Sequence, residues 1–148
     1  MKPYVQEAEV LRLLLSHGCI SGEKIIAWAD ETIMAEKEMD NHVLDLCTES
    51  PEKTPALLSR LSDIATGADK FAAMRTALGR MYDVVANDSP EDLAGFWANL
   101  GNIAGENKYQ LPEDLRFLNT LNEEKADLSV KNKALLQHLK HFKDLGAN

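Results

Sequence analysis

The 148-residue chain has few of the residues that build disulfide frameworks, zinc sites or membrane spans. Its two cysteines, Cys19 and Cys47, are too few for a disulfide framework, and there is no CxxC pair for zinc. The longest dense apolar patch, residues 10–15, is interrupted by Arg12 and is too short to cross a bilayer. The N-terminus lacks the basic flank and apolar region of a secretory signal. We therefore expect a cytoplasmic protein without a membrane partner.

Catalytic and cofactor-binding motifs are also missing. The glycines follow no predicted strand and precede no Lys-Ser/Thr pair, so the sequence contains no phosphate-binding loop. Glu38, His42 and Asp45 are close enough in sequence to share a helical face, and His138 and His141 share another. Neither set has the two Glu-x-x-His motifs of a di-iron bundle. A solvated polar face explains the first set, and the favourable interaction of cations with the C-terminal end of a helix dipole explains the second. The sequence predicts no catalytic residue, metal site or cofactor, and a metal-dependent helical enzyme is only a remote alternative.

The net charge of −8 is unevenly distributed. Residues 1–68 carry 12 acids and 6 bases, residues 69–127 carry 11 and 6, and residues 128–148 carry 1 and 4. Such an acidic body argues against direct nucleic-acid binding, which relies on clustered Lys and Arg. It fits a basic protein partner that is attracted electrostatically. Solubility alone is the simpler alternative explanation for the charge.

Apolar residues recur at helical spacing along the chain, and no alternating pattern typical of a strand is present. Pro3 favours the start of a first helix, and Gly18 suits the left-handed position just after its end. Ser21 is the expected N-cap of a second helix, and Asp40 that of a short third one. The second helix should turn one apolar face inward, formed by Ile25, Ile26, Trp28, Ala29 and Ile33.

Further start signals predict four or five more helices. Two tandem signals within residues 50–55 begin a fourth helix, which ends at Gly67. The fifth has the most regular apolar spacing, carried by Phe71, Met74, Leu78, Met81 and Val85. A sixth begins at Ser89, a seventh at Pro112, and a basic last helix covers about 128–145, either separate from the seventh or continuous with it. We therefore predict an all-α single domain, residues 1–148, of seven or eight helices packed as successive antiparallel hairpins.

Residues 50–65 align with residues 89–104 with six identities and no gap. The separation of 39 is near that of HEAT and armadillo repeats, whose helix pairs stack into a layer. Three of the six identities are a shared Ser-Pro-Glu helix start, which capping chemistry alone also explains. A HEAT- or armadillo-like stack is therefore one possible form of the predicted hairpins.

Negative charge is densest in residues 30–52, with eight carboxylates against one base, Lys37. Asp40 and Glu52 have a role at helix starts. The remaining like charges repel one another, and a cationic partner would relieve this repulsion. We predict that five of these acids bind a partner: Asp30, Glu31, Glu36, Glu38 and Asp45. Trp28 lies at helical spacing beside isoleucines and is assigned to the core rather than to an interface.

The pattern Ile20-Ser21, Ala27-Trp28-Ala29-Asp30 and Val43-Leu44-Asp45-Leu46 resembles the opening hairpin of a family of small helical immunity proteins. These belong to bacterial polymorphic-toxin and contact-dependent growth inhibition systems, and the resemblance covers residues 5–50. It implies a cytoplasmic, non-enzymatic protein that binds and neutralises a cognate toxin domain, often a basic nuclease acting on tRNA or DNA. Such proteins cover the active site or a substrate-binding face, with carboxylates in place of phosphates. The alternative is a helical adaptor or regulatory protein-binding module.

Overall fold

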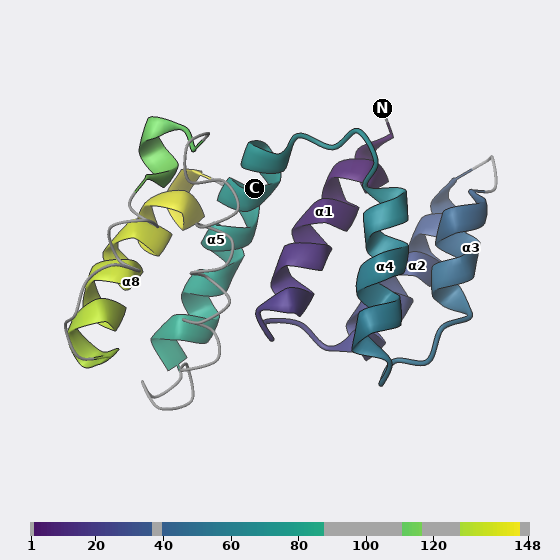
Figure 1. Ribbon diagram of the computed structural model, residues 1–148, viewed down its shortest axis with the longest axis horizontal. Coiled ribbons are helices and arrows are strands. Elements are labelled where there is room, and N and C mark those ends of the chain that lie inside the picture. The colour runs from purple at the N-terminus through teal and green to yellow at the C-terminus, as the bar shows by residue number, and fades with distance from the viewer. Residues whose placement is uncertain (1, 37–39, 88–110, 117–127, 146–148) are drawn as a thin grey trace. The chain divides into compact units, whose positions relative to one another are not determined.

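The computed structural model describes residues 2–36, 40–87, 111–116 and 128–145 (Figure 1). Within these ranges all regular structure is helical, with six α-helices, one 3₁₀ turn and no strand, which confirms the all-α prediction. The count is lower than the predicted seven or eight; the predicted sixth helix and most of the seventh lie outside the described residues. Contacts divide the chain into two compact units, residues 1–73 and 74–148.

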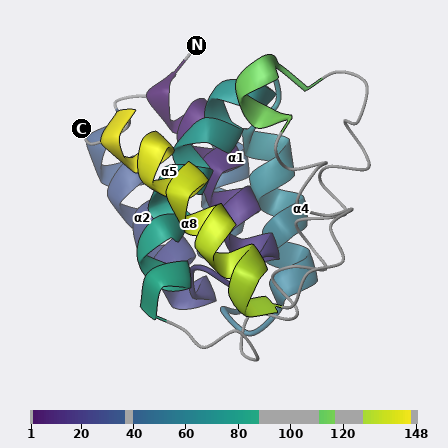
Figure 2. The same ribbon diagram turned by 90° about the vertical axis from the view of Figure 1, so that its left-hand side faces the viewer.

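The first unit contains four helices: α1 (Pro3–Ser16), α2 (Gly22–Ala35), α3 (Asn41–Cys47) and α4 (Thr54–Ile64). The most extensive helix pair is α1 with α4, followed by α2 with α3 and α3 with α4. In both views α4 lies alongside α1 (Figure 1, Figure 2). The main neighbour of α1 is therefore α4, although a simple series of hairpins predicts α2.

The core of this unit is built around α1, which is buried over most of its circumference because Val10, Leu11, Leu13 and Leu14 all lie below 5% exposure. The other helices contribute Ile25, Ala29, Val43, Leu46, Leu57, Leu61 and Ile64. Each large aliphatic side chain buried in this way stabilises the fold by roughly 1.5–3 kcal/mol.

The apolar face of α2 is narrower than predicted. Ile25 and Ala29 are fully buried, whereas Ile26, Trp28 and Ile33 are only partly covered. The reason is that α2 packs chiefly on one helix, α3, and touches α1 and α4 less. A helix with one main neighbour buries a thin stripe, so half of its circumference stays in solvent.

The predicted helix boundaries in this unit are confirmed by local geometry. The Ser21 side chain accepts a hydrogen bond from the Lys24 amide at 3.3 Å. The Asp40 carboxylate accepts one from the His42 amide at 2.8 Å. The two glycines at helix ends have positive φ angles, 71° at Gly18 and 92° at Gly67, as expected for left-handed positions.

Gly22 has a packing role that its place near a cap did not reveal. A Cβ atom added there would lie 2.1 Å from the carbonyl oxygen of Pro51 and 2.9 Å from a methyl group of Leu57. The start of α2 therefore contacts the backbone of the α3–α4 connection directly, and only glycine leaves room for it.

The second unit contains most of α5 (Lys70–Asn87), a 3₁₀ turn (Glu113–Leu115) and α8 (Leu128–Leu145). A Cβ atom at Gly79 would lie 3.0 Å from the carbonyl oxygen of Phe142, so α5 and α8 approach closely. Ion pairs join Arg75 to Asp114 at 2.7 Å and Lys143 to Asp83 at 2.8 Å. The buried apolar residues are Met74, Ala77, Leu78, Met81, Leu111, Leu115, Leu139 and Phe142.

The predicted apolar face of α5 is confirmed at Met74, Leu78 and Met81, and Phe71 is partly buried. The Val85 side chain lies outside the described part of the chain. None of the helices that the structure describes combines the length and hydrophobicity that a bilayer-spanning helix requires.

Candidate functional site

The solvent side of α2 forms a continuous strip, which we call the α2 outer face. Its exposed residues recur every three or four positions, which places them on one side of the helix. They are Glu23, Lys24, Ala27, Asp30, Glu31, Met34 and Ala35. The strip is therefore acidic in its middle and apolar toward the C-terminal end of the helix.

Met34 has the most unusual exposure on this face. The residue is 87% accessible, and it is the one large hydrophobic residue that is exposed among those the structure describes. The sequence analysis did not predict that Met34 is exposed. Its position could have indicated this, because it lies four residues after Asp30 and three after Glu31, on the side of the helix assigned to polar residues.

Asp30 and Glu31 are both exposed, and within the described ranges no cationic side chain pairs with either. Asp30 lies near Cys47 of α3. Burial, followed by a hydrogen bond to Asp30 and its negative charge, raises the pKa of the Cys47 thiol to about 11. The thiol is thus protonated at neutral pH and is a poor nucleophile.

Most other acids of the 30–52 stretch have partners inside the first unit. Lys2 pairs with Glu36 at 3.1 Å, and Arg60 lies 3.1 Å from Glu49 and 3.7 Å from Asp45. These bases come from α1's start and from α4, so the sequence count of one base for eight acids understates the neutralisation.

The acids at the helix starts are also engaged. The Tyr4 hydroxyl donates to the Asp40 carboxylate at 2.8 Å, in addition to the cap of α3. The Ser50 hydroxyl donates to Glu52, and this hydrogen bond holds the pKa of the Glu52 carboxyl below its ordinary value. Asp40 thus caps α3 as predicted, whereas Glu52 lies in the turn before α4, which begins at Thr54.

The structure describes four of the five acids predicted to bind a partner. Asp30 and Glu31 lie together on the α2 outer face, Glu36 is the C-cap of α2, and Asp45 lies on the exposed side of α3. Glu38 lies outside the described residues. Glu36 and Asp45 have basic partners. Of the four described acids in this group, Asp30 and Glu31 are therefore the two whose negative charge no described base balances.

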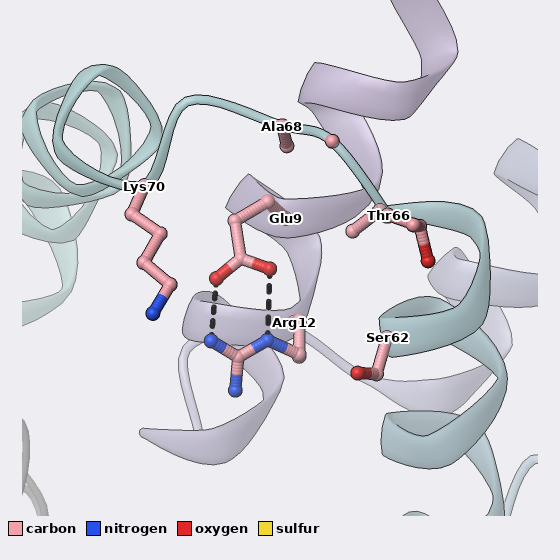
Figure 3. Close-up of a pocket in the computed structure, with 8 residues that line it drawn as sticks. Glu9, Arg12, Ser62, Thr66, Ala68 and Lys70 are labelled. Carbon is pink, nitrogen blue, oxygen red and sulfur yellow. Dashed lines mark hydrogen bonds and ion pairs between the residues drawn. The ribbon is translucent and has the colours of Figure 1, made fainter.

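A pocket of about 310 Å³ lies elsewhere in the first unit, between α1, the end of α4 and the start of α5 (Figure 3). Its wall carries the paired side chains of Glu9 and Arg12, in which the Nε and Nη2 groups of the arginine both donate to the carboxylate. Figure 3 shows Lys70 extending toward this pair, with the Ser62 hydroxyl on the opposite side. The lining suits a small polar group. Its residues come from three elements, so their sequence positions did not indicate it.

Metal coordination finds no support in the described part of the chain, where no group of three or more His, Cys, Asp or Glu side chains could hold an ion. His42, His138 and His141 are exposed. Partial burial, and then the charge of His141, lowers the pKa of His138.

Comparison with known proteins identifies no relative. No model of a known protein family, no curated protein and no solved structure matches the chain.

Proposed function

We propose that this protein is an immunity protein, which binds a cognate toxin domain in the cytoplasm and neutralises it without catalysis or a cofactor. The toxin is a cationic protein, with a nuclease as the favoured class. One observation carries the proposal: Asp30 and Glu31 lie exposed on α2 with no cationic partner among the described residues. The resemblance of residues 5–50 to the immunity-protein family is the reason to propose a toxin as the partner of this acidic surface.

The carboxylates act in two ways in this proposal. At a distance, the negative potential of Asp30, Glu31, Glu36, Glu38 and Asp45 attracts a basic domain and raises the association rate. In the complex, they take the place of substrate phosphates against the Lys and Arg residues of the toxin. Neither membranes nor nucleic acid bind the immunity protein directly, and the toxin's basic surface is covered instead.

The proposal includes the arrangement of the helices. Consecutive helices pack on one another from α2 to α4, whereas α1 packs chiefly on α4. A HEAT- or armadillo-like layer of such helices would hold the acidic helices rigidly. The alignment of residues 50–65 with residues 89–104 supports such a stack.

The test begins with the neighbouring reading frame. We expect a gene beside this one to end in a small basic domain that is lethal when expressed alone and harmless when co-expressed with this protein. A helical adaptor, the other protein-binding function consistent with this surface, would bind a partner without rescuing growth. If no neighbouring product is neutralised, the proposed function is wrong.

The surface is tested by charge reversal. A triple variant, Asp30→Lys, Glu31→Lys and Asp45→Lys, should lower the association rate by at least tenfold and reduce its dependence on salt. A control triple variant with the same change in net charge combines Asp63→Lys, Glu113→Lys and Asp144→Lys, three exposed acids that belong to neither α2 nor α3. Equal losses in both variants would show that only net charge matters and that the α2 surface is not the site.

A further inference from the structure

Met34 contributes little to the fold that carries it. With 87% of its surface accessible, Met34 packs against almost none of the residues that the structure describes. Lysine, glutamine or glutamate would form the helix equally well at this position and would be better solvated. The remaining property that distinguishes Met34 is a large, flexible apolar surface presented to solvent. Such side chains adapt readily to the pocket of a partner.

The neighbours of Met34 define what can cover it. Asp30 precedes it by one helical turn and Glu31 by three residues, so both carboxylates lie on the same side of α2. The flanking exposed residues Ala27 and Ala35 have short side chains, which leave a partner room to approach the helix closely. The α2 outer face is thus an apolar projection beside two carboxylates that no described cation neutralises.

We propose that Met34 is the apolar anchor of the toxin interface, which inserts into an apolar pocket of the toxin domain that Lys and Arg residues surround. Asp30 and Glu31 pair with those basic residues at the rim of the contact. This inference rests on the proposed function and adds to it the residue that holds the complex together. Hot spots of protein interfaces commonly combine a desolvated central side chain with a polar rim.

The apolar anchor and the two carboxylates should affect different rate constants of binding. A central apolar anchor governs the dissociation rate, because its contacts form only when the partners are docked. Exposed carboxylates govern the association rate and its dependence on salt. Substitution of Met34 should therefore change dissociation alone, whereas Asp30→Asn with Glu31→Gln should mainly slow association.

Two variants of nearly equal size isolate the apolar character of Met34. Against the toxin domain whose lethality the protein suppresses, Met34→Gln should raise Kd by about thirtyfold through faster dissociation, with the salt dependence of association unchanged. Met34→Leu should bind within about threefold of the natural protein. Both variants should fold normally, since the side chain is exposed. Equal affinity of Met34→Gln and the natural protein would overturn the inference and leave the proposed function standing.

Methionine oxidation gives a second readout that needs no substitution. In the free protein, dilute peroxide should oxidise Met34 faster than Met74 and Met81, whose exposures are 5% and 2%. In the complex, Met34 should be protected at least tenfold, as measured by peptide mass spectrometry, while the two buried methionines serve as internal controls. Unprotected Met34 in a formed complex contradicts the inference. If no toxin domain is neutralised at all, the proposed function fails and the anchor fails with it.

Discussion

Arg60 of α4 donates a hydrogen bond from Nε to the Glu49 carboxylate at 3.1 Å, across the connection between α3 and α4. The same guanidinium lies 3.7 Å from Asp45. One base thus balances two members of the acidic stretch, and it comes from a different helix. As a result, negative charge is unevenly distributed over the surface. Asp45 of α3 and Glu49, just after α3, are partly neutralised, whereas Asp30 and Glu31 of α2 have no cationic partner in the part of the chain described.

Replacing Arg60 should destabilise the first unit modestly. Arg60→Gln removes the ion pair with Glu49, whose side chain is only 20% exposed, and the weaker one with Asp45. We expect a loss of about 0.5–1 kcal/mol in the free energy of unfolding, measured by urea denaturation. Lys53→Gln makes the same change in charge at an exposed lysine near the start of α4 and should have almost no effect. A similar loss in both variants would mean that overall charge, rather than this contact, is responsible.

Replacing Gly22 should be more severe. In Gly22→Ala the new methyl group would start 2.1 Å from the Pro51 carbonyl oxygen, so α2 or the α3–α4 connection has to move. We expect a loss of about 2 kcal/mol or more, visible as a lower urea midpoint.

Gly18 provides the contrast, because a Cβ atom there meets nothing within 4 Å and only its φ of 71° opposes substitution. Gly18→Ala should therefore cost about 1 kcal/mol, and Gly18→Asn less, since asparagine tolerates the left-handed region. If Gly22→Ala proves milder than Gly18→Ala, the close contact with Pro51 is not present in solution.

Cys47 should resist alkylation until the pH is high. With its pKa raised to about 11, roughly 0.1% of the thiol is ionised at pH 8, against about 10% for an ordinary thiol of pKa 9.0. In a Cys19→Ser background, iodoacetamide should react with Cys47 about a hundred times more slowly than with the same protein unfolded in urea.

The contribution of Asp30 can be separated from that of burial. Asp30→Asn removes the carboxylate that disfavours the thiolate, so the pKa of Cys47 should fall and alkylation at pH 8 should become several times faster. The pKa of Cys47 should stay above that of an ordinary thiol in this variant, because burial is the larger cause of its increase. An unchanged rate would place Asp30 away from the thiol.

Local signals in the sequence were sufficient for the helices of the first unit. Proline at a helix start, Ser21 and Asp40 as caps, and glycine at the left-handed positions act within a few residues, and the structure confirms them. The core positions Met74, Leu78 and Met81 of α5 follow from apolar spacing for the same reason. The exposed state of Asp30 and Glu31 was predictable too, since both face away from the apolar stripe of α2.

Long-range contacts were not predictable in this way. The extensive packing of α1 on α4, the ion pairs of Lys2 and Arg60, and the need for glycine at position 22 each join segments far apart in the chain. Local periodicity carries no information about which helices become neighbours, because many arrangements bury the same apolar stripes. By itself, the sequence determined an all-α fold, its caps and an acidic surface. Only the tertiary structure decided which acids have basic partners, because those bases come from other helices. It also decided that Met34 is exposed beside Asp30 and Glu31, which lack a described cationic partner, because the exposure of a residue on α2 depends on which helices cover it.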